Sequence, residues 1–250
     1  MNEIFLSIVI PCFDELVNLQ KGVLVKLHDF LKTRKYSFEV IIVDDGSMDG
    51  SVAFLEKFTS LHKDFSLIKN RHLGKSGSVT TGVLKAKGSF ILFTDMDQAT
   101  PISEVDSLLI FAREGYDIVI GSRNARKGAP WTRAVMSQGM ILLRKIIVGI
   151  YDISDTQCGF KLFSKKSAKN LFTEIKSLHS GFSTVKGSKV SAGFDVELLY
   201  LARRMGYSIK EAPVDWLYVE TRRVNPIWDS IDGLIALIQI RINAVKGVYK

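Results

Sequence analysis

The sequence has little that would belong to a secreted or membrane-spanning protein. Only two of its 250 residues are cysteines, Cys12 and Cys158, too few for a disulfide framework and without the spacing of a metal site. Residues 1–3 carry an acid and lead straight into an apolar segment, unlike a secretory signal. The longest uncharged apolar stretches, 134–143 and 233–240, are shorter than the roughly 20 residues of a spanning helix. We therefore expect a cytoplasmic protein of a reducing compartment that does not span a membrane.

Acidic residues are absent between Asp117 and Asp152, in a chain with a formal net charge of +8. The same stretch holds six basic residues: Arg123, Arg126, Lys127, Arg133, Arg144 and Lys145. A nucleic-acid-binding protein would repeat basic or aromatic residues along a groove or recognition helix, and no such motif is present. We expect the stretch to face a phosphate-bearing lipid or an anionic membrane surface. For Arg126 and Lys127, a solubilising basic face explains the charge equally well.

Three apolar segments of the chain each end in acidic residues. They are 6–11, followed by Asp14 and Glu15; 40–43, followed by Asp44 and Asp45; and 90–94, followed by Asp95 and Asp97. Because such segments alternate with helical patterns, we predict an α/β fold with a mostly parallel sheet in one domain. Ligands of these sheets bind beyond the carboxyl ends of the strands. Two carboxylates one residue apart suit a divalent cation that also holds a diphosphate, although an isolated pair often only shapes a turn.

Several short motifs occur together in one order. They are Ser7-Ile8-Val9-Ile10-Pro11 with Glu15, Val43-Asp44-Asp45-Gly46-Ser47, Gly74-Lys75-Ser76-Gly77, Asp95-Met96-Asp97 and Gly121-Ser122-Arg123. In this order they resemble the inverting glycosyltransferases of family 2, over roughly residues 5–220. The run 155–163 narrows the likeness, because it is similar to dolichyl-phosphate β-glucosyltransferases and polyprenyl-phosphate mannosyltransferases. The resemblance implies a GT-A (Rossmann-like) fold, and transfer of glucose or mannose from UDP-glucose or GDP-mannose to a polyprenyl or dolichyl phosphate.

The resemblance also implies roles for particular residues. Asp95 and Asp97 would hold Mg²⁺ or Mn²⁺, which stabilises the departing nucleoside diphosphate. The nucleotide-sugar would be bound by Pro11, Glu15, Asp44, Asp45, Lys75, Asp95, Asp155 and Gln157, the last two through sugar hydroxyls. A lipid phosphate is already anionic and needs cations to guide it, so Arg123, Arg133 and Ser137 are the candidates for the acceptor site. Asp97, Arg123 and Arg133 are thus the predicted catalytic residues.

Two segments have the composition of amphipathic or buried helices. In the first, 131–151, Arg133 and Ser137 lie one turn apart and Arg144 lies on a similar heading, on an otherwise strongly apolar helix. It is either core or a helix at a lipid interface with its basic stripe turned to phosphate. The second, 226–250, is an amphipathic C-terminal helix, part of or packed on the domain formed by 1–225. Related enzymes often carry membrane anchors, so attachment here would be peripheral or through a partner.

Three alternatives remain open at this stage. Family members that build polysaccharide or glycolipid use hydroxyl acceptors, which need a carboxylate base, and Asp195 or Glu197 is available. A sugar-1-phosphate nucleotidyltransferase would share the sheet, but its Gly-rich loop after the first strand is missing. A scaffold without catalysis would be expected to lose the metal acids.

Mannose-transferring relatives often carry Gln where this chain has Ala99, which favours glucose as the transferred sugar. The four histidines show no partner pattern and are expected to be structural: His28, His62, His72 and His179.

Overall fold

The computed structural model describes residues 3–123, 131–179, 193–217 and 226–249. In the helix that begins at Trp131, side chains are described from Ile141 onward, and in the helix that begins at Pro226, from Ile231 onward. Seven strands form one sheet in the order β3-β2-β1-β4-β6-β5-β7. Their bounds are β1 (Leu6–Cys12), β2 (Phe38–Asp44), β3 (Phe65–Lys69), β4 (Phe90–Phe93), β5 (Ile118–Arg123), β6 (Lys161–Ser164) and β7 (Ile209–Val214).

Strand direction determines where the polar strand ends meet. Strands β1, β2, β3 and β4 are parallel to one another, and β5 is parallel to β7. Strand β6 is antiparallel to both β4 and β5. The carboxyl ends of β1, β2, β4 and β5 therefore share one edge of the sheet with the start of β6. This confirms the mostly parallel sheet predicted from the sequence.

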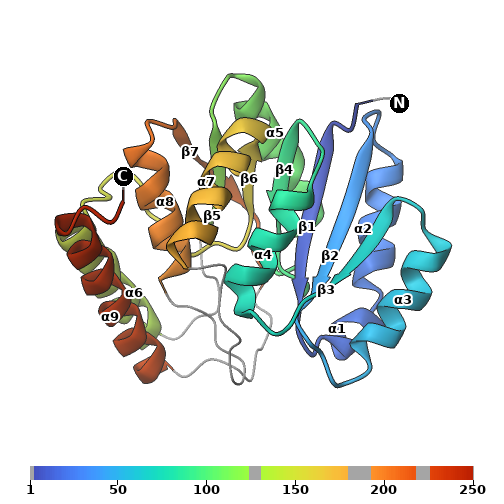
Figure 1. Cartoon of the computed structure of the whole chain (residues 1–250), viewed down its shortest axis with the longest axis horizontal. Helices are drawn as coiled ribbons and strands as arrows, with labels where there is room; N and C mark the ends of the chain where they lie inside the picture. The colour runs from blue at the N-terminus through green and yellow to red at the C-terminus, as the bar shows by residue number, and fades with distance from the viewer. Residues whose placement is uncertain (1–2, 124–130, 180–192, 218–225, 250) are drawn as a thin grey trace.

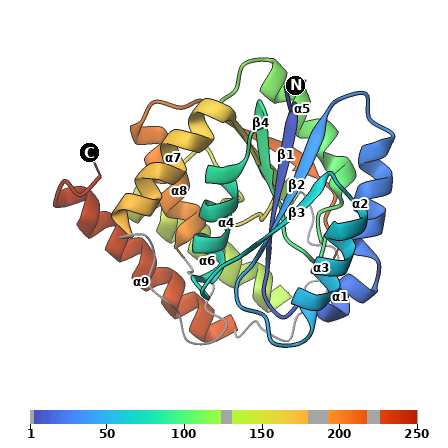
Figure 2. The ribbon, with the colours of Figure 1, turned by 45° about the vertical axis from the view of Figure 1, so that its right-hand side comes forward.

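Helices cover both faces of the sheet (Figures 1 and 2). Their bounds are α1 (Leu16–Gln20), α2 (Val23–Lys32), α3 (Ser51–Leu61), α4 (Gly74–Lys85), α5 (Val105–Arg113), α6 (Trp131–Val148), α7 (Lys165–Leu178), α8 (Phe194–Arg204) and α9 (Pro226–Val245), with a 3-10 turn η1 (Ile102–Glu104) before α5. Apolar residues of α1, α2, α3 and α5 pack in one core, and those of α4, α7 and α8 in the other. Helices α6 and α9 pack on each other at one end of the molecule (Figure 1).

The central strands are mostly apolar because both of their faces are covered. In β1, Ile8 and Ile10 point into the first core, whereas Val9 points into the second. Strand β2 alternates in the same way, with Ile42 in the first core and Val43 in the second. Side chains alternate across a strand, so a continuous apolar run is what a strand buried on both faces requires.

Two boundaries differ from the expectation based on helical patterns. The helical pattern of residues 16–33 predicts one helix, but the structure divides this segment into α1 and α2 at Gly22, whose φ is +76°. A left-handed residue cannot continue a right-handed helix, and glycine adopts this conformation without strain. The predicted helix 131–151 ends at Val148, because Gly149 again has a positive φ of 79°. Among the described residues, no helix combines the length and hydropathy that crossing a bilayer requires.

Candidate active site

The acidic pair lies directly beyond β4, at the edge where the strand ends meet. Met96 between the two acids is buried in the core, whereas Asp95 and Asp97 are partly exposed. Asp97 Oδ1 accepts a hydrogen bond of 3.0 Å from the backbone N–H of Ala99. Burial raises the pKa of Asp97, and the neighbouring Asp95 charge adds to this effect. The site therefore holds a surplus of negative charge that a divalent cation would neutralise.

Asp95 lies between a lysine and a glycine. Lys75 Nζ, from the first turn of α4, is 2.6 Å from Asp95 Oδ1. Burial acts to lower the pKa of Lys75, but the carboxylates of Asp95, Asp195 and Asp97 outweigh it and raise the pKa. A Cβ atom at Gly159 would lie only 2.0 Å from Asp95 Oδ2, so a side chain at this position would displace the Asp95 carboxylate from its present place. In this structure, Asp95 therefore forms an ion pair with Lys75.

The acids after β2 differ in how they are used. The carboxylate of Asp45 accepts hydrogen bonds from the backbone N–H groups of Leu73 and Gly74, at 2.8 Å and 2.7 Å, and contacts His72 Nδ1 at 3.0 Å. Asp44 accepts from Gly46 and Ser47 through one oxygen, whereas its other oxygen, Oδ1, is buried and has no hydrogen-bond partner among the described residues. An unsatisfied buried acceptor at a strand end suits a ligand donor. Asp44 Oδ1 is therefore available to a ligand donor, whereas the carboxylate of Asp45 anchors the loop before α4.

Backbone strain is concentrated at the same edge. Within the described residues, the non-glycine residues with positive φ are Asp14, His72 and Gln98, at 52°, 32° and 50°, and each follows a strand in a loop at the carboxyl edge. Gln98 Oε1 is also buried and has no hydrogen-bond partner in the part of the chain that the structure describes. The His72 ring stacks on Phe13 at a centroid distance of 4.3 Å. Strained residues cluster where function requires a particular geometry, which adds to the case for a ligand site here.

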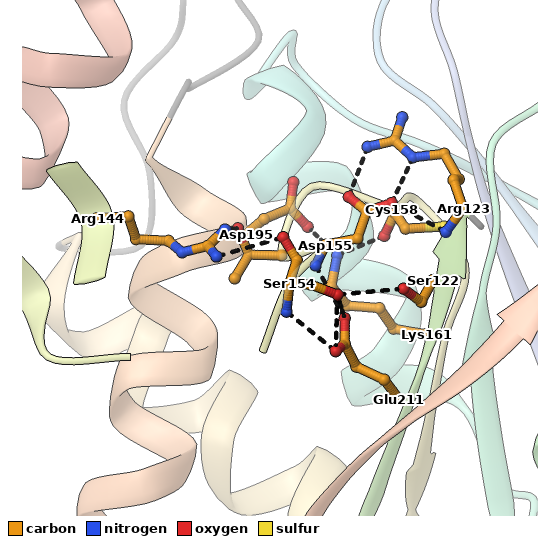
Figure 3. A network of polar contacts seen from close by, with 10 residues as sticks. Ser122, Arg123, Arg144, Ser154, Asp155, Cys158, Lys161, Asp195 and Glu211 are labelled. Atoms are coloured by element: carbon orange, nitrogen blue, oxygen red, sulfur yellow. Dashed lines mark hydrogen bonds and ion pairs between the residues drawn. The ribbon is translucent and has the colours of Figure 1, made fainter. Parts of the chain in front are cut away.

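The loop between α6 and β6 forms a second polar cluster at this edge (Figure 3). Arg123 donates two hydrogen bonds of 2.6 Å to the carboxylate of Asp155, a bidentate pair. Glu211 accepts from the backbone N–H groups of Ser154 and Asp155, at 3.0 Å and 2.8 Å. The loop is therefore fixed from both β5 and β7, so that Asp155 and Arg123 reach the site as a pair.

Arg144 holds the same loop from α6. Its guanidinium is buried and donates to Thr156 Oγ1 at 2.7 Å and to the Ile153 carbonyl at 2.6 Å. Burial lowers its pKa, although Asp155 and Glu211 partly oppose this. Of the two alternatives for this helix, the structure therefore supports packing against the protein at Arg144, and Arg144 does not belong to a basic stripe that faces lipid phosphate. Arg133 and Ser137 lie within α6, but their side chains fall outside the described part.

The two acids considered as a general base both have partners. Asp195 Oδ1 lies 2.5 Å from the ammonium of Lys161, which is completely buried. Glu197 accepts a hydrogen bond of 2.7 Å from the hydroxyl of Tyr249 and contacts His179 Nε2 at 2.8 Å. Lys161 was missed from the sequence, but a lysine inside the apolar run 160–163 indicates a buried charge that needs a partner. The remaining candidates are Pro11 in β1, the partly buried Glu15, whose Oε2 accepts from Asn18, and the exposed Gln157.

The acidic pair fits a hard divalent cation by the chemistry of its donors, which are carboxylate oxygens. Within the described residues, no third histidine, cysteine or carboxylate joins Asp95 and Asp97 in a ligand cluster. Such a cation would complete its coordination with diphosphate oxygens and water, as is usual for Mg²⁺. The mostly parallel sheet with acidic residues at its carboxyl edge has the architecture of an α/β enzyme of the GT-A type.

Comparisons with known proteins identify the family. Residues 7–172 match Glycosyl transferase family 2, and the chain belongs to this family. A dolichyl-phosphate beta-glucosyltransferase of Drosophila melanogaster is 32% identical over 266 residues, 98% of this chain and 77% of that protein. The enzyme of that name from Saccharomyces cerevisiae is 32% identical, over 99% and 77%. The fold resembles a mannosyltransferase from Pyrobaculum calidifontis solved with GDP-Man and Mn²⁺, with a TM-score of 0.62, 19% identity, and coverage of 96% of this chain and 64% of that one.

Proposed function

We propose that this glycosyltransferase moves a glucosyl residue from a nucleoside diphosphate glucose to the phosphate of a polyprenyl-type lipid, with inversion at the anomeric carbon. The observation that carries the proposal is the pair Asp95 and Asp97 at the shared carboxyl edge, beside Lys75. The relatives named for glucosyl transfer to dolichyl phosphate, which span nearly the whole chain, support it. Ala99, where mannose-transferring enzymes often have Gln, also favours glucose.

The donor side of the reaction uses the acidic edge. Asp95 and Asp97 would hold Mg²⁺ or Mn²⁺, which when bound supplies positive charge to the leaving diphosphate. Lys75 would transfer its contact from Asp95 to a diphosphate oxygen once the cation neutralises Asp95. Asp44 would accept a hydrogen bond from the nucleoside through Oδ1, with Pro11 and Glu15 bordering the same pocket. Asp155 and Gln157 would hold sugar hydroxyls.

The acceptor side needs no general base. A phosphate oxygen of the lipid attacks the anomeric carbon, the bond from that carbon to the diphosphate oxygen breaks, and the electron pair leaves with the nucleoside diphosphate. No proton has to be removed, in contrast to transfer to a hydroxyl. The structure favours this chemistry because Asp195 is ion-paired with Lys161, and Glu197 is engaged by Tyr249 and His179. Arg123, Arg133 and Ser137 would receive the acceptor phosphate.

Helices α6 and α9 supply a surface suited to a lipid acceptor. Exposed apolar side chains lie on both helices: Leu142, Leu143 and Ile146 on α6, and Ile231, Ile235, Ile238, Ile242 and Val245 on α9. Arg241 is exposed on α9, and the exposed Lys246 directly follows the end of this helix. An apolar surface with basic residues is typical of helices that lie at an anionic bilayer surface. We propose that this surface attaches the enzyme peripherally to a membrane.

Nucleoside diphosphate release tests the proposal. Purified protein is given UDP-glucose or GDP-mannose, with and without a short polyprenyl phosphate, and with Mg²⁺, Mn²⁺ or EDTA. We expect release that requires the lipid phosphate and the metal and is faster with the glucosyl donor. Release with a polyprenol but not with its phosphate would favour a hydroxyl acceptor. Nucleotide binding without release under any condition would indicate a non-catalytic scaffold.

A further inference from the structure

Lys161 has an unusual environment for a lysine. It begins β6, where it pairs with Phe93 of β4, and its side chain is 0% exposed. A buried ammonium costs free energy unless charges and hydrogen bonds compensate it. Three groups surround it: Asp195 Oδ1 at 2.5 Å, the Cys158 carbonyl oxygen at 2.6 Å and the Phe93 ring at 5.1 Å from its centroid. Figure 3 shows Lys161, Asp195 and Cys158 in the network around Arg123 and Asp155.

Asp195 has a second lysine within electrostatic range. Besides its contact with Lys161, its charge acts on Lys75, as the charges of Asp95 and Asp97 do. Lys75 Nζ contacts Asp95 at 2.6 Å. The charges of two carboxylates, Asp95 and Asp195, therefore act on the ammonium of Lys75. Only Asp195 has a fixed cation of its own, because Lys161 is enclosed by the sheet.

The backbone that borders Asp95 connects to the same ion pair. The Cys158 carbonyl accepts from Lys161, and the next residue, Gly159, lies against Asp95 Oδ2. Asp95 thus has the Gly159 backbone on one side and Lys75 on the other. Asp95 therefore lies between the Lys75 ammonium and a backbone segment that binds Lys161, the ion-pair partner of Asp195.

We propose that Lys161 is a positioning residue for the nucleotide-sugar site: it neutralises Asp195, so that Asp195 does not compete with Asp95 for Lys75. The inference rests on the proposed function, because it takes Lys75 and Asp95 as donor-site residues. Lys161 touches neither substrate nor cation in this scheme. Without it, the unpaired Asp195 would attract Lys75, which would then be less available to a diphosphate oxygen.

The test compares removal of the cation with removal of the anion. Lys161→Met keeps the length of the side chain and leaves Asp195 charged, whereas Asp195→Asn removes the competing charge. The readouts are the Kd of UDP or GDP with Mn²⁺ by calorimetry, binding of Mn²⁺ alone by electron paramagnetic resonance, and stability in urea. We expect Lys161→Met to raise the nucleotide Kd about tenfold. We expect Asp195→Asn to leave it within about twofold, although both variants lose stability.

The double variant covers the case in which Lys161→Met does not fold. Replacing a buried ion pair by two neutral residues is often tolerated, so Lys161→Met with Asp195→Asn is expected to fold and to bind nucleotide like the wild type. Weak nucleotide binding by the double variant, or by Asp195→Asn alone, would overturn the inference, because Asp195 would then be needed itself. Equal binding by Lys161→Met and the wild type would also overturn it.

Lys169→Met is the matched control. The ammonium of Lys169, on α7, donates to the carbonyls of Val83, Leu84 and Ala86, at 2.9, 2.7 and 2.7 Å, at the opposite end of α4 from Lys75. This variant should lose stability without any change in nucleotide Kd. A change as large as that of Lys161→Met would show that the effect is general destabilisation and would overturn the inference. A wild-type chain that binds neither UDP nor GDP would instead overturn the proposed function.

Discussion

The hydroxyl of Tyr249 donates a hydrogen bond of 2.7 Å to Glu197 Oε1, across 52 positions of sequence. Tyr249 is almost fully buried, and burial together with the Glu197 carboxylate raises its pKa, so the phenol stays protonated. The other oxygen of Glu197 contacts His179 Nε2 at 2.8 Å. Glu197 therefore fixes the C-terminal segment to α8, two residues after Asp195. It serves the structure rather than proton transfer.

This arrangement predicts that the stability of the protein depends on pH through the protonation of His179. The hydrogen bond to Glu197 raises the pKa of His179 above its ordinary 6.5, against the opposing effect of burial. A group whose pKa is higher in the folded than in the unfolded protein stabilises the fold fully at pH values below its unfolded pKa. This contribution to stability is lost as the pH rises through its folded pKa. We expect the urea midpoint to fall between about pH 6 and 8, and to fall less in His179→Gln. Equal pH profiles for the two proteins would contradict the assignment.

The thiols should be unreactive in the folded protein. Burial, with the neighbouring Asp44 and Glu15 carboxylates, raises the pKa of Cys12 to about 12. Burial likewise raises the pKa of Cys158, more than Lys161 and Arg123 lower it. Because the thiolate is the reactive form, we expect neither cysteine to be labelled within minutes by a thiol reagent at pH 8, and both to react in urea. Rapid labelling of the native protein would show that this edge opens in solution.

The strand ends could be predicted from the sequence because one physical rule links them. Acidic residues after buried apolar segments must meet at one edge of a parallel sheet, which placed Asp44, Asp95 and Asp97 together. The separate uses of Asp44 and Asp45 could not be predicted, since they depend on which carboxylate faces the start of α4. The buried face of α9 could not be predicted either, because apolar residues at helical spacing suit packing or exposure. The structure buries Leu237 and Ile240 and exposes Ile235 and Ile238.

Partners distant in sequence were also beyond prediction. The motif 155–163 was recognised by resemblance alone, while its physical basis lies in Glu211, Arg144 and Asp195, which come from other elements. The presence of glycine at position 159 is explained only by the Asp95 carboxylate that lies beside it in the structure. The roles of all the site residues, and the division of the chain at 225, remain predictions.

Asp97 should be required for its charge. Asp97→Asn keeps the size of the side chain and its hydrogen bond from Ala99, but removes the charge that would hold a divalent cation. We expect turnover to fall by about 100-fold or more, with an unchanged unfolding temperature in the absence of metal. Lipid-dependent nucleoside diphosphate release with and without Mn²⁺ measures the effect. A folded Asn variant with near-normal metal-dependent transfer would exclude Asp97 as a ligand.

The apolar surface of α9 should bind anionic vesicles. Ile235 and Ile238 are 59% and 45% exposed, so a charge at either position disturbs a bilayer contact without opening the core. We expect Ile235→Glu and Ile238→Glu to weaken co-sedimentation with phosphatidylserine vesicles several-fold, and salt to weaken that of the wild type by screening. Val25→Glu, at an equally exposed position on α2, is the control. Wild-type protein that stays in the supernatant at low salt would argue against the membrane surface.

Arg133 should act on the acceptor and not on the donor. The donor diphosphate has a metal site at Asp95 and Asp97, whereas the acceptor phosphate has the acid-free segment between Asp117 and Asp152 as its source of positive charge. We expect Arg133→Ala to raise the apparent KM for polyprenyl phosphate about tenfold or to lower kcat, with the Kd of the nucleotide nearly unchanged. Lysine should restore this only partly, because an ammonium lacks the planar fork that grips two phosphate oxygens.

The control for this substitution is Arg204→Ala, since Arg204 is exposed at the end of α8. It removes the same charge from the protein as a whole, so an equal loss in both variants would indicate a general electrostatic effect on lipid binding. A shift confined to Arg133 locates the acceptor phosphate at α6. If Arg133→Ala instead abolishes nucleotide binding and leaves the acceptor KM intact, the residue belongs to the donor site. Arg123, held by Asp155 through two hydrogen bonds, and Ser137 would then be the remaining candidates for the acceptor phosphate.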